Sequence, residues 1–85
     1  MEKIYVINGT MMDGSEIVAT YTANPFQAQE EYLGLIALDM ESVHIEDANT
    51  GEVYAFYYHK ELEWGTEVSR GVSREFTEIL AGLRA

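Results

Sequence analysis

Residues 42–59 read SVHIEDANTGEVYAFYYH, and this stretch decides the fold. Its first six residues alternate polar and apolar side chains, and its last eight are rich in the aromatic and β-branched residues that strands favour. Between them lies a short polar turn, in which Gly51 is placed to adopt the positive φ that other residues avoid. The pattern predicts a β-hairpin with strands over residues 42–47 and 52–59.

Two registers are compatible with this hairpin, and a shift of one residue exchanges the two faces of a strand. A four-residue loop, Ala48 to Gly51, buries more aromatic area and is preferred; its core residues are Val43, Ile45, Tyr54, Phe56 and Tyr58. The opposite face then carries His44, Glu46, Val53, Ala55, Tyr57 and His59. A three-residue loop exposes Tyr54, Phe56 and Tyr58 instead. Both registers leave large apolar groups on both faces of the second strand.

The residues before this hairpin predict another hairpin and a helix. Lys3 to Asn8 and Glu16 to Thr22 have strand patterns, and the turn pair Asp13-Gly14 lies between them. Asn24-Pro25 marks a helix start, with the asparagine as N-cap and the proline in the first turn. This helix is expected to end near Asp39. Its buried stripe is expected to contain Phe26, Leu33, Ile36 and Met40, widened by Tyr32, Leu35 and Leu38.

After the hairpin the sequence becomes polar, and the residues that follow predict a second helix. It is expected to begin at Ser69 or Ser73, either of which is a suitable cap, and to end at Leu83. Phe76 lies on its apolar face. Trp64, the only tryptophan, is expected to close the end of the core, the alternative being an exposed binding anchor.

Together these elements predict a single α+β domain over residues 1–85, with the order ββαββα. We expect a four-stranded, mostly antiparallel sheet with two helices packed on one face. The chain has room for only one domain, and its 47% apolar residues are too many for a disordered acidic tail.

The net charge of −10 is the most informative total. Residues 1–59 hold ten acids and one base, whereas residues 60–85 hold five acids and four bases. Such a field repels nucleic acid and anionic membranes, and it attracts basic protein surfaces. The sequence has no signal peptide and no apolar run long enough to span a membrane, and with no cysteines a cytoplasmic location is expected.

No constellation of residues predicts catalysis, a cofactor or a metal. In the preferred register His44 and His59 lie about 13 Å apart on one face, too far to bind one ion. His44 with Glu46 offers only two ligands, and the loop from Asp47 to Glu52 lacks the spacing of a calcium site. Two arginines one helical turn apart, Arg70 and Arg74, are expected to pair with Glu67 and Glu78.

The preferred hypothesis is therefore an acidic protein-binding module that contacts a basic protein. Its sharpest version is a nucleic-acid mimic, an inhibitor of a nuclease, repressor or defence complex of the kind that phage and mobile elements direct against restriction or CRISPR systems. The expected partner-binding residues are Glu30, Glu31, Asp39, Glu41, Glu46, Asp47, Glu52 and Tyr57. The alternative is a structural or adaptor protein that forms a homodimer through an open sheet edge or face.

Overall fold

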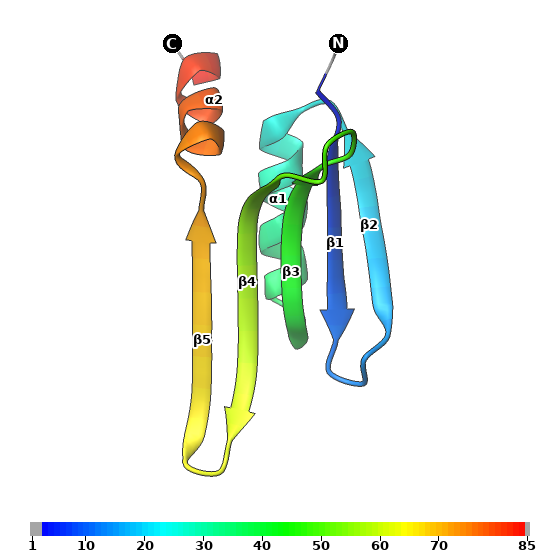
Figure 1. Ribbon diagram of the computed structural model, residues 1–85, viewed down its shortest axis with the longest axis vertical. Coiled ribbons are helices and arrows are strands. Elements are labelled where there is room, and N and C mark those ends of the chain that lie inside the picture. Colours follow the sequence, from blue (N-terminus) through cyan, green and yellow to red (C-terminus); the bar gives the residue numbers. More distant parts are fainter. Residues whose placement is uncertain (1–2, 85) are drawn as a thin grey trace.

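A computed structural model describes residues 3–84, which form an α+β fold, as predicted (Figure 1). The elements are β1 (Tyr5–Met11), β2 (Glu16–Thr22), α1 (Pro25–Ile36), β3 (Met40–Asp47), β4 (Val53–Leu62), β5 (Gly65–Val72) and α2 (Arg74–Arg84). Both hairpins and both helices of the sequence prediction are present. One strand, β5, was not predicted.

The sheet has five antiparallel strands rather than four, in the order β2-β1-β3-β4-β5. The fifth strand arises because β4 continues to Leu62 and the chain then turns back. All of β5, Gly65–Val72, therefore pairs with β4, from Leu62↔Gly65 to Ala55↔Val72. Strands β2 and β5 form the two edges of the sheet.

The presence of β5 decides which serine starts the second helix. The backbone N–H of Phe76 donates to Ser73 Oγ at 3.1 Å, so Ser73 is the cap and Ser69 lies within β5. Arg74 pairs with Glu78 at 3.1 Å, as predicted. Glu67 and Arg70 lie in a strand, three residues apart, and therefore point to opposite faces of the sheet.

Helix α1 begins as its sequence predicts. Asn24 Oδ1 accepts hydrogen bonds from the backbone N–H groups of Phe26 (2.9 Å) and Gln27 (3.3 Å), and Pro25 occupies the first turn. The helix ends at Ile36, three residues before the expected position. Tyr32 and Leu35 of the predicted stripe are buried, but Leu33 and Leu38 are 45% and 57% exposed. The residues that face the sheet are Pro25, Ala28, Tyr32 and Leu35.

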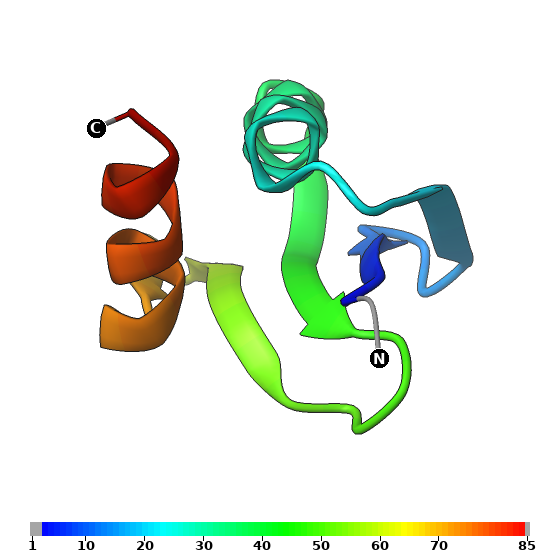
Figure 2. The same cartoon turned by 90° about the horizontal axis from the view of Figure 1, so that it is seen from above.

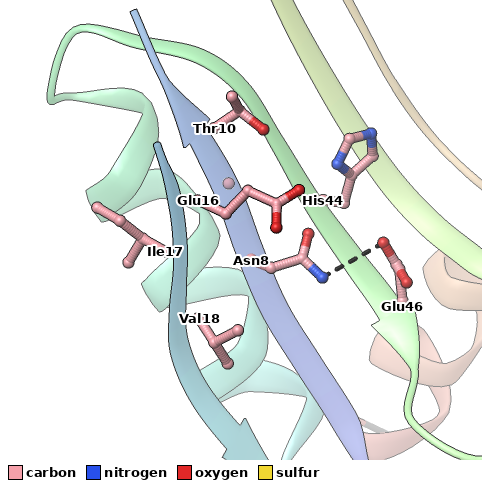
Figure 3. Close-up of a pocket in the computed structure, with 8 residues that line it drawn as sticks. Asn8, Thr10, Glu16, Ile17, Val18, His44 and Glu46 are labelled. Carbon is pink, nitrogen blue, oxygen red and sulfur yellow. Dashed lines mark hydrogen bonds between the residues drawn. The ribbon is translucent and has the colours of Figure 1, made fainter. Parts of the chain in front are cut away.

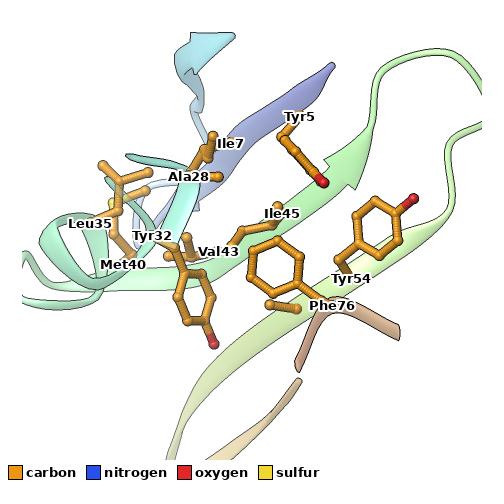
Figure 4. Close-up of a cluster of buried hydrophobic side chains, with 11 residues drawn as sticks. Tyr5, Ile7, Ala28, Tyr32, Leu35, Met40, Val43, Ile45, Tyr54 and Phe76 are labelled. Carbon is orange, nitrogen blue, oxygen red and sulfur yellow. The ribbon is translucent and has the colours of Figure 1, made fainter. Parts of the chain in front are cut away.

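Both helices pack on one face of the sheet, where the core lies (Figures 2 and 4). The buried hydrophobic cluster contains Tyr5, Ile7, Ala28, Tyr32, Leu35, Met40, Val43, Ile45, Tyr54, Ala55 and Phe76. The ring of Phe76 stacks on Tyr54 at 5.8 Å and meets Tyr5 edge-on at 5.7 Å. These contacts fix α2 over β1 and β4.

The β3–β4 register corrects the sequence prediction at one point. Near the turn the preferred register holds, since Glu46 pairs with Val53 and the N–H of Asp47 donates to the carbonyl of Glu52 at 2.8 Å. A bulge then shifts the pairing by one residue, so Ile45 lies opposite Ala55. An extra residue in one strand reverses the side-chain alternation beyond it.

The bulge exchanges the faces of the residues that follow Tyr54. Tyr54 is buried, as predicted, but Phe56 and Tyr58 lie opposite His44 and Ser42 rather than in the core. Tyr57, which was expected on the opposite face as a partner-binding residue, pairs with Val43 and packs against the core. Ala55, expected on the opposite face, is 1% exposed in the core, and His59 shares its face. The preferred register was therefore wrong for every residue from Ala55 to His59.

Asp47 holds the turn of this hairpin, and Gly51 adopts a φ of 78° as predicted. Asp47 Oδ1 accepts from the N–H groups of Asn49 (2.7 Å) and Thr50 (3.1 Å), and Oδ2 accepts from the Tyr54 hydroxyl (3.1 Å). These bonds, that of Asn49 first, lower the pKa of Asp47 below its ordinary value. The carboxylate therefore stabilises the fold in its charged form.

Replacing Asp47 with asparagine is expected to lower stability at pH 7 and to have less effect in acid. A carboxylate whose pKa is lowered by folding stabilises the folded state at pH values above its unfolded pKa of about 3.9. This stabilisation is lost as the pH falls through the lower pKa of the folded state. The free energy of unfolding of both proteins, measured by urea denaturation at pH 7 and pH 3, checks this. If the two proteins differ in free energy of unfolding by the same amount at both pH values, the prediction is contradicted.

Candidate partner-binding surface

The face of the sheet opposite the helices is the candidate site. We call it the open face, because neither helix of the described chain covers it (Figure 2). Side chains reach it from β1 to β5 at every second residue, apart from the bulges. They include Asn8, Thr10, Glu16, Val18, Tyr21, Ser42, His44, Glu46, Val53, Phe56, Tyr58, Lys60, Glu67 and Ser69.

A pocket lies on the open face where β2, β1 and β3 run side by side (Figure 3). Its volume is about 290 Å³, and its lining residues are Asn8, Gly9, Thr10, Glu16, Ile17, Val18, His44 and Glu46. The Glu46 carboxylate accepts from Asn8 Nδ2 at 3.3 Å. Two carboxylates, those of Glu16 and Glu46, thus line one shallow pocket with hydrogen-bonding neighbours. These carboxylate acceptors suit an ammonium or guanidinium donor.

Aromatic rings extend the surface from the pocket towards β4. His44 Nε2 and the Tyr58 hydroxyl are 2.9 Å apart and share a hydrogen bond, with the two rings edge to face at 5.3 Å. Phe56 lies next to Tyr58, with ring centroids 5.7 Å apart. Tyr58 is 49% exposed, so the row of rings presents both apolar area and polar tips to the surroundings.

A second cluster of charged side chains lies near the β3–β4 turn and joins the start of β1 to the start of α2. Lys3 Nζ donates to Glu75 at 2.8 Å and to the Tyr54 hydroxyl at 3.0 Å, and the bond to Glu75 does most to raise the pKa of Lys3. The same bond lowers the pKa of Glu75, whereas desolvation and then the neighbouring Glu75 raise the pKa of Glu52. The groups of this cluster mostly bind one another, so its chemistry is structural.

The structure does not gather the predicted partner-binding residues on one surface. Glu30 and Glu31 are on α1, and Asp39 and Glu41 lie around the start of β3. Asp47 is buried by its own turn, Glu52 lies beside Glu75, and Tyr57 packs on the core. Of the eight residues, Glu46 alone lines the open-face pocket.

Glu16, Asn8 and Tyr58 belong to this surface, although the sequence pattern did not single them out as binding residues. Asn8 and Glu16 lie in strands that the sequence already predicted, the first from its β-favouring composition and the second from its alternation. The pattern does not give the strand order, and it is this order that places β2 and β3 on either side of β1.

The described residues contain no group of three or more histidine, cysteine or acidic side chains placed to hold a metal ion. Nor do residues 3–84 include a helix with the length and apolar character to cross a membrane. No family model matches the sequence, and neither the curated proteins nor the solved structures include a significant match to it. The geometry of the open face and the charge therefore carry the functional argument.

Proposed function

We propose that this chain is a small protein-binding module that contacts a basic protein through its open face. The observation that carries the proposal is the pair of carboxylates, Glu16 and Glu46, that lines a pocket on a sheet face that neither described helix covers. A lysine or arginine side chain of a partner fits such a pocket, and the rings of His44 and Tyr58 supply apolar contact next to it. Aromatic residues surrounding a charged contact are typical of binding hot spots.

The net charge supports the same kind of partner. At −10, the chain attracts basic proteins at long range and accelerates their encounter, an effect that salt screens. Among the side chains that the structure describes, the ion pairs are Lys3–Glu75 and Arg74–Glu78, so most of the acidic side chains described have no basic partner. Exposed examples outside the open face are Glu30, Asp39 and Glu41.

The sharper form of this proposal is nucleic-acid mimicry. A protein that handles nucleic acid presents lysine and arginine side chains to phosphates. The carboxylates of Glu16 and Glu46 would occupy those same side chains. The chain would then act as an inhibitor, and duplex nucleic acid would compete with it for the partner.

Two matched double variants test the proposal. Purified basic nucleic-acid-binding proteins serve as probes, and their affinity is measured by calorimetry at about 50 and 300 mM salt. Glu16→Gln with Glu46→Gln is expected to weaken binding at least about fivefold, the equivalent of about 1 kcal/mol. Glu30→Gln with Glu31→Gln removes the same charge from α1 and is expected to change affinity less than about twofold.

Equal losses of affinity in the two double variants would mean that binding depends only on the total charge of the chain. That result would contradict an open-face site. For the mimicry, duplex DNA is expected to displace the chain from the probe. Simultaneous binding of chain and DNA to one probe would contradict inhibition.

A homodimer is the second candidate, and the exposure of β5 favours it. This edge strand is exposed along Gly65–Arg70, and unpaired edges are templates for pairing with another copy. Sedimentation at low and high salt separates the two functions. Association of two chains of like charge strengthens as salt screens their repulsion, whereas binding to a basic partner weakens.

A further inference from the structure

The end of the β4–β5 hairpin projects beyond the rest of the sheet (Figure 1). Strand β4 pairs with β3 only as far as Tyr58, and its remaining residues, His59 to Leu62, pair with β5 alone. This two-stranded extension contributes to the 45 Å long axis of a molecule that is 23 Å and 20 Å across. We call residues 59–68 the hairpin tip.

Trp64 occupies the turn of the hairpin tip and is 82% exposed. The expectation that it closes the core was therefore wrong, because β4 carries it away from the helices. The turn consists of Glu63 and Trp64, between the paired residues Leu62 and Gly65. A largely exposed indole has a large apolar area in contact with water, and tryptophan is among the residue types most enriched at binding hot spots.

The charge around Trp64 is negative. Glu61, Glu63 and Glu67 are all exposed within the hairpin tip, and the sole lysine there, Lys60, lies directly opposite Glu67 in the ladder. Lys60 is thus matched by Glu67 across the strands, and neither Glu61 in β4 nor Glu63 in the turn has a lysine or arginine facing it in the hairpin. The hairpin tip thus combines an exposed indole ring with carboxylates in the same hairpin.

We propose that the hairpin tip binds an arginine-bearing segment of a partner protein, with a guanidinium group stacked on Trp64 and paired with Glu61 or Glu63. A guanidinium is planar, so it stacks on an indole face and donates to a carboxylate at the same time, whereas an ammonium is a compact and strongly hydrated point charge. The carboxylates that favour arginine also repel anionic membranes and a second copy of the chain.

This site is separate from the open-face pocket, and the inference rests on the proposed function only in that both need a basic partner. The pocket lies over β2, β1 and β3, whereas the tip belongs to the far ends of β4 and β5. A partner with arginines at both places would gain affinity from two linked contacts. Either contact can exist without the other.

The test is a titration of the ¹⁵N-labelled chain with a 12-residue peptide of alternating arginine and glycine. Trp64 is the only tryptophan, so a single indole N–H resonance and the fluorescence emission both report on the tip. We expect this resonance to shift on binding. We also expect a peptide with lysine in place of arginine to bind at least about threefold more weakly, because an ammonium is more strongly hydrated and cannot stack as a plane on the indole.

Trp64→Ala is expected to weaken binding of the arginine peptide at least about fivefold. Leu38→Ala, a matched control that also removes an exposed apolar side chain, is expected to change it less than about twofold. Because the indole is exposed, the variant is expected to fold, and circular dichroism verifies this. Glu61→Gln with Glu63→Gln provides a second variant that leaves the ring in place and is expected to weaken binding as well.

The two proposals fail in different ways in this one experiment. An unmoved indole resonance, or equal affinity of Trp64→Ala and the native chain, overturns the inference, even where amides of Asn8, His44 and Glu46 shift and support the open-face site. Shifts confined to the hairpin tip support the inference and count against that site. Vesicles of phosphatidylcholine and phosphatidylglycerol that shift the Trp64 emission to the blue without peptide overturn the inference in favour of a membrane.

Discussion

Replacing Phe76 with alanine is expected to lower the free energy of unfolding by about 3–5 kcal/mol, the usual range for a fully buried phenylalanine. Phe76 is 1% exposed, and its ring contacts the rings of Tyr5 and Tyr54 at 5.7 Å and 5.8 Å. It is the one described residue of α2 that belongs to the buried cluster, so its removal leaves a cavity at the place where the helix is attached.

Urea denaturation with linear extrapolation measures this loss. Glu78→Ala is the matched control on the same helix, because it removes only an exposed ion pair with Arg74 and is expected to change stability by less than about 0.5 kcal/mol. Should the alanine variant fail to fold, Phe76→Leu keeps most of the volume and is expected to lose only about 1–1.5 kcal/mol. A loss below about 1 kcal/mol for Phe76→Ala would mean that α2 does not pack on the sheet.

The parts of the fold that the sequence predicts are those with local causes. The Asp13-Gly14 turn forms with Gly14 at a φ of 89°, and Asn24 caps α1 through its own side chain. Each of these signals depends on residues within a few positions of one another. Period-two alternation likewise assigns β2 and β3, and a run of β-favouring apolar residues assigns β1, without knowledge of their neighbours.

The fifth strand and the bulge have no such local cause. Residues 65–72 are mostly polar and small, and Val72 continues the helical spacing of Phe76, so the pattern favours a helix that begins too early. The strand forms because β4 is long enough to offer it a partner. In the same way, Tyr54 stays in the core while Phe56 leaves it because one extra residue enters β4, and nothing in the alternation marks that residue.

The candidate site depends on the same non-local information. Glu16 and Glu46 are thirty residues apart in the sequence, and they share a pocket because β1 lies between their strands. Trp64 is exposed because β4 and β5 extend past β3. The composition alone favours a basic partner for this chain, and the sheet topology adds the side chains through which we propose that it binds.

Gly9→Ala is expected to destabilise the chain by about 1–3 kcal/mol, as overpacking of a filled interior does. Gly9 lies in β1 between β2 and β3, and a Cβ atom there would meet the carbonyl oxygen of Ser42 at 2.8 Å and Met40 Cε at 2.7 Å. The methionine can move its terminal methyl group, but the carbonyl belongs to the neighbouring strand, so the ladder itself must shift.

Gly34→Ala is the matched control for this substitution. That glycine lies in α1, where an added Cβ atom would meet no neighbouring element within 4 Å, and alanine is expected to stabilise the helix by about 0.5–1 kcal/mol. Opposite signs for the two substitutions in urea denaturation support the close approach of β1 and β3, whereas a Gly9→Ala variant as stable as the native chain would contradict it.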